Sequence, residues 1–131
     1  MLIEVYSQYI IDLILEFLLI KSYEINLEKR ATYEGFIKGK IIFIDQSYLH
    51  IREFVDVETN IDRKMYSYQY MNPDNNLIFR YDNTEHHQKL NLPNFPHHKH
   101  EESEKNVINS NAPFLKDVIK EITAIISTKF I

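Results

Sequence analysis

The alternation of hydrophobic and polar positions predicts a helix at each end of the chain. Residues 3–20 are hydrophobic at most positions, and all of their polar residues except Ser7 recur at every fourth position: Glu4, Gln8, Asp12 and Glu16. Positions four apart lie on one face of an α-helix, so this spacing predicts a helix with a single narrow polar stripe. Residues 112–128 also carry hydrophobic residues at helical spacing, which predicts a second helix.

Between these helices, residues 22–81 have the pattern of several strands joined by short turns. Hydrophobic stretches are separated by turn sequences such as Asp45-Gln46-Ser47 and Asn72-Pro73-Asp74-Asn75-Asn76. Successive strands with short connections form an antiparallel meander. We therefore predict an α+β fold, with a four- to five-stranded antiparallel β-meander, a long N-terminal helix and a C-terminal helix, in a single domain over residues 1–131.

Pairing the predicted strands symmetrically about their turns assigns each side chain to one face of the sheet. In this register Arg52, Tyr68 and Arg80 form one row across three strands, opposite Ile51 and Phe79. Tyrosine rings stack on bases and arginines hold phosphates, so the row predicts a platform for nucleic acid. A solvated sheet face or a protein interface would carry the same residues, and the sequence leaves these alternatives open.

The composition excludes several classes of protein. The chain has 131 residues, of which 44% are hydrophobic, with no cysteine, two glycines and a net charge of −4. The absence of cysteine excludes disulfides and thiolate metal sites. The net charge excludes a globally basic nucleic-acid-binding surface but not a local one. Two glycines are too few for a phosphate-binding loop, and the nucleophile motif GxSxG is missing.

The hydrophobic first helix raises the question of a membrane or an export signal. Three carboxylates in its polar stripe would be costly in lipid, and no basic segment precedes it. We expect no membrane segment and a cytoplasmic protein. The hydrophobic surface of this helix is too wide for one sheet face. It therefore predicts a homodimer or a partner contact through this helix or the closing one.

Residues 82–109 are predicted to form a long His-rich loop. They contain five of the six histidines: His86, His87, His97, His98 and His100. A loop of this length in a compact domain is usually functional. Histidine exchanges a proton near neutral pH and is the commonest metal ligand, so the loop is a candidate site of chemistry.

Three functions are compatible with this segment. A metal-independent ribonuclease needs a general base, a general acid and cations, which His98, His100 and Arg80 would supply. The second is a metal site, although no standard zinc spacing is present. Its ligands would come from His98, His100, His86 or His87, and Asp82 or Glu85. The third is recognition of a partner without catalysis.

The order of aromatic, arginine and histidine residues resembles the TumE family of small prokaryotic toxins. The resemblance rests on Tyr66-x-Tyr68-x-Tyr70, Leu77-Ile78-Phe79-Arg80-Tyr81-Asp82-Asn83, His86-His87 and Phe95-Pro96-His97-His98-Lys99-His100. It implies the toxin half of a toxin–antitoxin pair, a cytoplasmic location and a helix-turn-helix antitoxin as partner. The resemblance does not specify a catalytic mechanism or the residues of an active site.

Taken together, these features predict a toxin that acts on RNA through histidine, arginine and tyrosine side chains. The predicted catalytic residues are His98, His100, Arg80 and Tyr81. The predicted substrate-binding residues are Arg52, Tyr68, His86, His87 and Lys99. No metal and no cofactor belong to this prediction. The alternatives are a non-enzymatic protein- or nucleic-acid-binding module and a metal-dependent hydrolase with histidine ligands.

Overall fold

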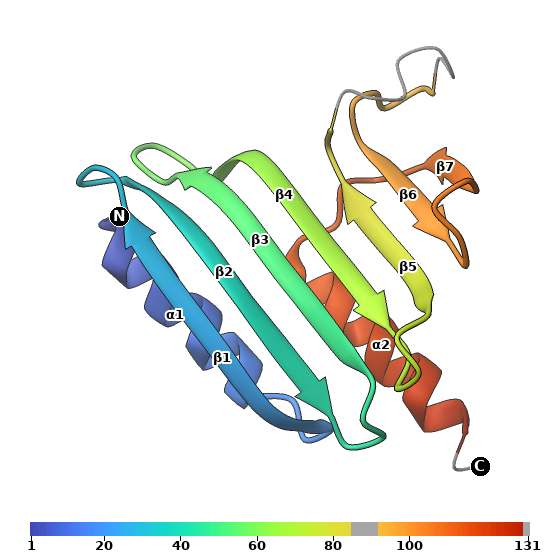
Figure 1. Ribbon diagram of the computed structural model, residues 1–131. Helices are drawn as coiled ribbons and strands as arrows, with labels where there is room; N and C mark the ends of the chain where they lie inside the picture. The colour runs from blue at the N-terminus through green and yellow to red at the C-terminus, as the bar shows by residue number, and fades with distance from the viewer. Residues whose placement is uncertain (85–91, 130–131) are drawn as a thin grey trace.

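The computed structural model describes residues 1–84 and 92–129, which form a seven-stranded sheet with both helices on one face (Figure 1). The elements are α1 (Ile3–Leu15), β1 (Ile20–Lys29), β2 (Glu34–Phe43), β3 (Tyr48–Asp56), β4 (Asp62–Met71), β5 (Leu77–Asp82), β6 (His98–Glu101), β7 (Val107–Asn109) and α2 (Leu115–Thr128). The strands lie side by side in chain order and pair antiparallel. The predicted α+β class with a helix at each end is confirmed.

The predicted count of four to five strands is wrong, because the segment predicted as a His-rich loop contributes two more. β6 pairs with β5 through Asp82↔His98 and Arg80↔His100, and β7 pairs with β6. The residues of β6 are histidines, a lysine and a glutamate, so no hydrophobic alternation marks this strand in the sequence. The histidine segment therefore extends the sheet, and His98 and His100 belong to a regular strand.

Helix α1 is shorter than the predicted span of residues 3–20, because the chain turns after Leu15 and enters β1 at Ile20. The predicted polar stripe of this helix lies at the surface, as expected. Leu2, Val5 and Tyr9 are also exposed, so hydrophobic side chains remain on its outer side. A homodimer or partner contact through this helix stays a prediction. Within residues 1–84 and 92–129, no helix has the length and hydrophobicity needed to cross a membrane.

A buried carboxylate ties the helices to the middle of the sheet. The side chain of Glu53, on β3, is almost fully buried and accepts hydrogen bonds from the hydroxyls of Tyr6 and Tyr68, each at 2.5 Å. Arg63 donates to the Tyr68 hydroxyl at 3.2 Å and to the last two backbone carbonyls before the Phe114 cap of α2. Burial, and then the negative charge of Glu53, raise the pKa of Tyr68 well above its usual value. This network fixes α1 and the start of α2 against β3 and β4.

Two β-bulges decide which face the tyrosines occupy. The register shifts between Phe54 and Val55 where β3 meets β4, and between Tyr70 and Met71 where β4 meets β5. A bulge adds one residue to one strand, which sends every following side chain to the opposite face relative to an unbulged pairing.

Tyr68 consequently pairs with Ile51 and Tyr81, and not with Arg52 and Arg80 as predicted. It is fully buried beneath the helices together with the other two tyrosines of β4. The predicted row through Tyr68 is wrong, and this residue cannot serve as a stacking platform. Arg52 and Arg80 do share the uncovered face of the sheet.

Candidate functional site

The uncovered face of the sheet carries two adjacent rows of polar side chains that run across β2 to β6. The pairing of the strands places Lys38, Arg52, Ser67, Asp82 and His98 in the first row. It places Lys40, His50, Gln69, Arg80 and His100 in the second. Residues two apart on a strand share a face, so the rows are direct neighbours. Lysine and arginine dominate one end of the rows, and both rows end on a histidine of β6.

A groove of about 880 Å³ follows these rows. Its lining residues are Lys38, Gly39, His50, Ile51, Arg52, Met65, Tyr66, Ser67, Gln69, Arg80, Asp82 and Thr84. Partial burial, and then the nearby charge of Lys40, lower the pKa of His50 and favour its neutral form. The positive charge of the groove therefore comes from Lys38, Arg52 and Arg80.

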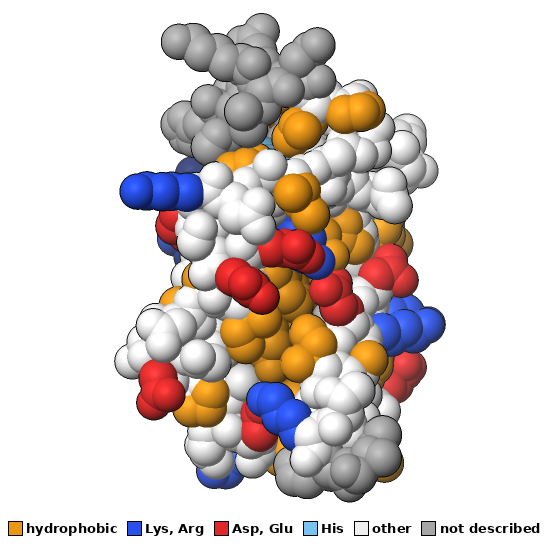
Figure 2. Space-filling model, turned by 90° about the vertical axis from the view of Figure 1, so that its right-hand side faces the viewer, with side chains coloured by type: hydrophobic (Ala, Val, Ile, Leu, Met, Phe, Trp, Pro, Cys, Tyr) orange, Lys and Arg blue, Asp and Glu red, His pale blue; other side chains and the backbone are white. Residues whose placement is uncertain are grey.

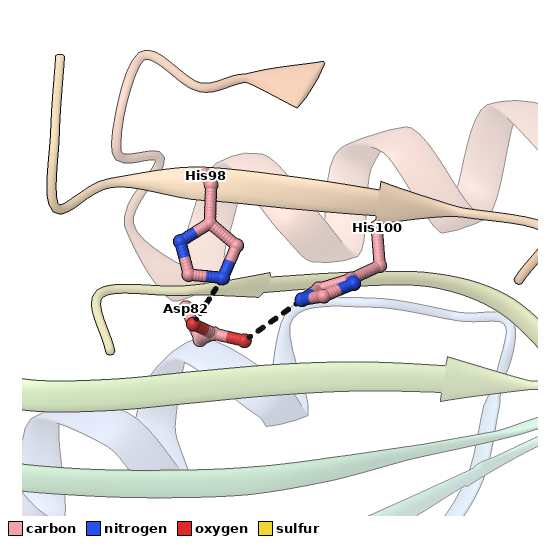
Figure 3. A group of neighbouring side chains, drawn as sticks. All are labelled: Asp82, His98 and His100. Carbon is pink, nitrogen blue, oxygen red and sulfur yellow. Dashed lines mark ion pairs between the residues drawn. The ribbon is translucent and has the colours of Figure 1, made fainter. Parts of the chain in front are cut away.

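At one end of the groove, a carboxylate from β5 meets two imidazoles from β6 (Figure 3). The Nε2 atom of His98 lies 2.7 Å from Oδ1 of Asp82, and Nε2 of His100 lies 3.6 Å from Oδ2 of the same carboxylate. The two rings are 4.9 Å apart in an edge-to-face arrangement. The backbone amide and the hydroxyl of Thr84 also donate to Oδ1 of Asp82. All three side chains thus converge on one point at the end of β5.

Backbone carbonyls hold both imidazoles with Nδ1 directed away from Asp82. The Nδ1 atom of His98 lies 2.9 Å from the carbonyl oxygen of Pro96, and Nδ1 of His100 lies 2.9 Å from the carbonyl oxygen of Glu104. A carbonyl oxygen only accepts, so each Nδ1 must carry the proton and donate it. The Nε2 atoms are then the ones directed at Asp82.

Arg80 closes the cluster on the side of the groove. Its Nε donates to Oδ2 of Asp82 at 2.9 Å, its Nη2 donates to Nε2 of His100 at 3.1 Å, and both Nη atoms bind the carboxylate of Glu104 at 2.6 and 2.7 Å. Burial works against the charged guanidinium, but the hydrogen bonds to Glu104 and Asp82 outweigh it and raise the pKa of Arg80. Burial lowers the pKa of His100, which favours its neutral form as an acceptor from Arg80.

The histidines lie deeper than the arginine. The side chains of His98 and His100 are each 2% exposed, against 21% for Arg80. On the side of the molecule seen in Figure 2, hydrophobic side chains gather between acidic ones and histidine hardly reaches the surface. Arg80 and Asp82 line the groove, and the two imidazoles lie beside them on β6 without being part of the lining. The structure therefore brings together three of the four predicted catalytic residues, but it does not place the histidines directly on the groove.

The fourth predicted catalytic residue, Tyr81, lies on the opposite, helix-covered face. Its hydroxyl donates to Glu121 of α2 at 2.7 Å, and burial is the main reason that its pKa rises to about 12. Lys99, predicted to bind substrate, lies on the same face and bridges Glu101 and Glu121 at 3.0 Å each. Both residues contact α2 on the face opposite Asp82, His98 and His100, so the structure does not bring them together with the rest of the predicted site.

The remaining residues predicted to bind substrate are Arg52, Tyr68, His86 and His87. Arg52 lines the groove, whereas Tyr68 is buried in the core. His86 and His87 lie outside the described residues.

The predicted site had left out Asp82 as a central residue and Lys38, His50 and Gln69 as groove residues. A sequence signal for Asp82 exists, because Arg80 and Asp82 are two apart, as are His98 and His100. Such spacing places each pair on one face of a strand. No signal in the sequence identified the segment carrying the histidines as the neighbouring strand.

The fold and the cluster define a small α+β protein with a cationic groove that ends at two histidines and a carboxylate. A family model described as Toxin TumE matches residues 10–127, so the chain belongs to the TumE toxin family, as the resemblance predicted. Membership identifies it as the toxin component of a toxin–antitoxin system and implies an antitoxin partner. No curated protein and no solved structure matches the chain. The helix-turn-helix type of the antitoxin stays a prediction.

Proposed function

We propose that this toxin acts on RNA, which binds along the groove and is cleaved beside Asp82, His98 and His100. One observation carries the proposal: the cationic side chains of the groove lead directly to a carboxylate–imidazole cluster. Nucleic acids bind proteins mainly through their phosphates, which require positive side chains arranged along a track. Cleavage requires proton transfer and charge neutralisation at one phosphate of that track.

Arg80 is the residue best suited to hold the phosphate that reacts. Its planar guanidinium can form two parallel hydrogen bonds with phosphate oxygens, as it does here with the carboxylate of Glu104. That carboxylate belongs to a side chain that is 60% exposed, so a phosphate can replace it without disturbing the bond from Arg80 to Asp82. RNA carries its own nucleophile, the 2′-hydroxyl, next to each phosphate. A base beside Arg80 removes the proton of this hydroxyl, and its oxygen attacks the phosphorus. The bond from phosphorus to the 5′ oxygen then breaks, and an acid at the same phosphate protonates the departing oxygen.

A second candidate function is recognition without catalysis. It is favoured by the near-complete burial of His98 and His100, which keeps both imidazoles away from direct contact with a large ligand. In that case the cluster would only shape the groove, and the toxin would act by blocking a partner. The two functions differ in whether RNA is broken.

Induced expression in a bacterium separates these functions. We expect growth to stop and cellular RNA to be cleaved within the same interval, because the proposed activity destroys RNA directly. Growth and RNA integrity are followed together after induction. Growth arrest with intact RNA would reject cleavage and support the blocking function.

Reversing the charge of the groove should weaken RNA binding. In the variant Lys38→Glu with Arg52→Glu, we expect affinity for a single-stranded RNA oligonucleotide to fall at least about tenfold. The binding should also depend less on salt. The logarithm of the association constant falls as the logarithm of the salt concentration rises, and each lost phosphate contact makes this slope less steep by about 0.7. The measurement is fluorescence anisotropy at several salt concentrations.

The matched control is Lys116→Glu with Lys120→Glu, which makes the same change of charge on exposed positions of α2, on the helix side. This control should bind RNA as the unmodified protein does, apart from a small long-range effect. Equal losses in both double variants would mean that net charge, and not the groove, governs binding.

A further inference from the structure

We propose that Asp82, His98 and His100 form a binding site for a divalent transition-metal ion. Each residue offers one ligand atom, and these atoms all lie within 4.8 Å of one another (Figure 3). Two imidazole nitrogens and one carboxylate oxygen are a common protein ligand set for such ions, which keeps positions open for water or substrate. The site stands on this geometry. Its use in cleaving RNA rests on the function proposed above.

The surroundings of the three ligands have the features that metal sites require. Imidazoles that bind a metal almost always donate their other ring N–H to a carbonyl or carboxylate, which fixes their orientation. Here the carbonyls of Pro96 and Glu104 accept from Nδ1 of His98 and His100. Both ligand histidines sit on β6 opposite β5, so paired strands, and not loops, set their spacing.

Burial also distinguishes this cluster from an exposed group of polar residues. The side chain of Asp82 is 3% exposed and those of both histidines are 2% exposed. The imidazoles are not among the residues that line the groove, whereas direct proton transfer needs contact at about 3 Å, so it would require them to move toward the substrate. A metal ion held by these atoms can act in their place, because a bound water then supplies the base.

Arg80 competes with the metal ion for the Nε2 atom of His100. Its Nη2 donates to Nε2 of His100, and its Nε donates to Oδ2 of Asp82. A metal ion would use the one lone pair of His100 Nε2, so its binding must release Nη2 of Arg80 from that nitrogen. The bond from Nε to Oδ2 of Asp82 can remain, because a carboxylate has lone pairs for both partners. The existing bonds from both Nη atoms to Glu104 hold the guanidinium while Nη2 leaves His100. Metal binding would therefore remove one of the contacts that keep Arg80 in place, and a phosphate could then replace the exposed carboxylate of Glu104.

The donor set favours Zn²⁺ and similar ions over Mg²⁺. Imidazole nitrogen suits zinc and its neighbours, whereas Mg²⁺ prefers oxygen ligands and retains several waters. Only one carboxylate is present among the three ligands. We therefore choose Zn²⁺ as the probe and Mg²⁺ as the comparison ion.

The test is calorimetric titration of the full chain, first stripped of metal with a chelator and without RNA. We expect a single Zn²⁺ per chain and no comparable binding of Mg²⁺. The variants His98→Asn and His100→Asn keep a side-chain N–H for the backbone carbonyl but lack the Nε2 atom. Each should bind Zn²⁺ at least about 100-fold more weakly, since even the supporting residues of metal sites contribute about 10- to 100-fold. The control His97→Asn, on a neighbouring histidine bonded to Tyr66, should bind normally.

The variant Arg80→Ala tests the site in a second way, because it keeps all three proposed ligands of the metal ion. Loss of the competing guanidinium should increase Zn²⁺ affinity about tenfold or more. Equal Zn²⁺ binding by the unmodified protein and by the His98→Asn variant would overturn the site, as would no Zn²⁺ binding by both the unmodified protein and Arg80→Ala. Zn²⁺ binding without RNA cleavage would leave the site standing and overturn only its role in the proposed function. RNA cleavage without Zn²⁺ binding would overturn the metal site and leave the proposed function standing.

Discussion

Replacing His98 and His100 together with asparagine should abolish the toxicity of the protein. Both Nε2 atoms point at Asp82, and the reaction needs them either as carriers of protons or as ligands of a metal ion. Loss of a general acid–base contribution alone typically lowers a rate about 10²- to 10⁴-fold. The measurement is growth after induced expression, with the integrity of cellular RNA followed in the same cultures.

The asparagine variant is chosen to separate chemistry from folding. Its amide still offers a donor for the carbonyls that now accept from the two Nδ1 atoms. Circular dichroism and the unfolding midpoint of the purified variant check that the sheet is retained. The control His97→Asn should stay toxic. A folded double variant that still arrests growth would rule out any chemical role of these two histidines.

Replacing Glu53 with alanine should cause a large loss of stability. The carboxylate accepts from the hydroxyls of Tyr6 and Tyr68, and both tyrosines are buried. Each buried hydroxyl proton left without an acceptor costs about 1–3 kcal/mol, and the removed side chain also leaves a cavity. We therefore expect the free energy of unfolding to fall by about 3–5 kcal/mol, a large part of the roughly 5–15 kcal/mol of a typical domain. Urea denaturation followed by circular dichroism measures it.

Two further variants show whether the loss comes from the network. Glu53→Gln keeps the size and one acceptor oxygen, so it should lose clearly less stability than the alanine variant. Glu34→Ala removes another sheet glutamate, whose bond to Lys64 at 2.8 Å lies near the surface. Pairs of that kind contribute about 0–1 kcal/mol, so this change should be small. A Glu53→Ala variant as stable as Glu34→Ala would show that the buried network contributes little.

The sequence by itself determined the features that depend on local pattern. The two end helices follow from hydrophobic residues at helical spacing, and the turn at Asn72 follows from side chains that bond their own backbone. The sequence also supplied Arg80, His98 and His100 as candidate residues, since their side chains can hold a phosphate or transfer a proton. The family follows from the order of its aromatic, arginine and histidine residues.

Only the tertiary structure decided which face each strand presents and how many strands there are. Two bulges, each a shift of a single residue, buried Tyr68 and left Arg52 and Arg80 uncovered. Local pattern does not report such a shift, because Tyr68 and its neighbours on β4 read equally well as a stacking surface and as a core. β6 is likewise hidden, since its polar residues become a strand only by pairing with β5. That pairing is also what brings His98 and His100 against Asp82, so long-range strand pairing, which no local pattern encodes, created the candidate site.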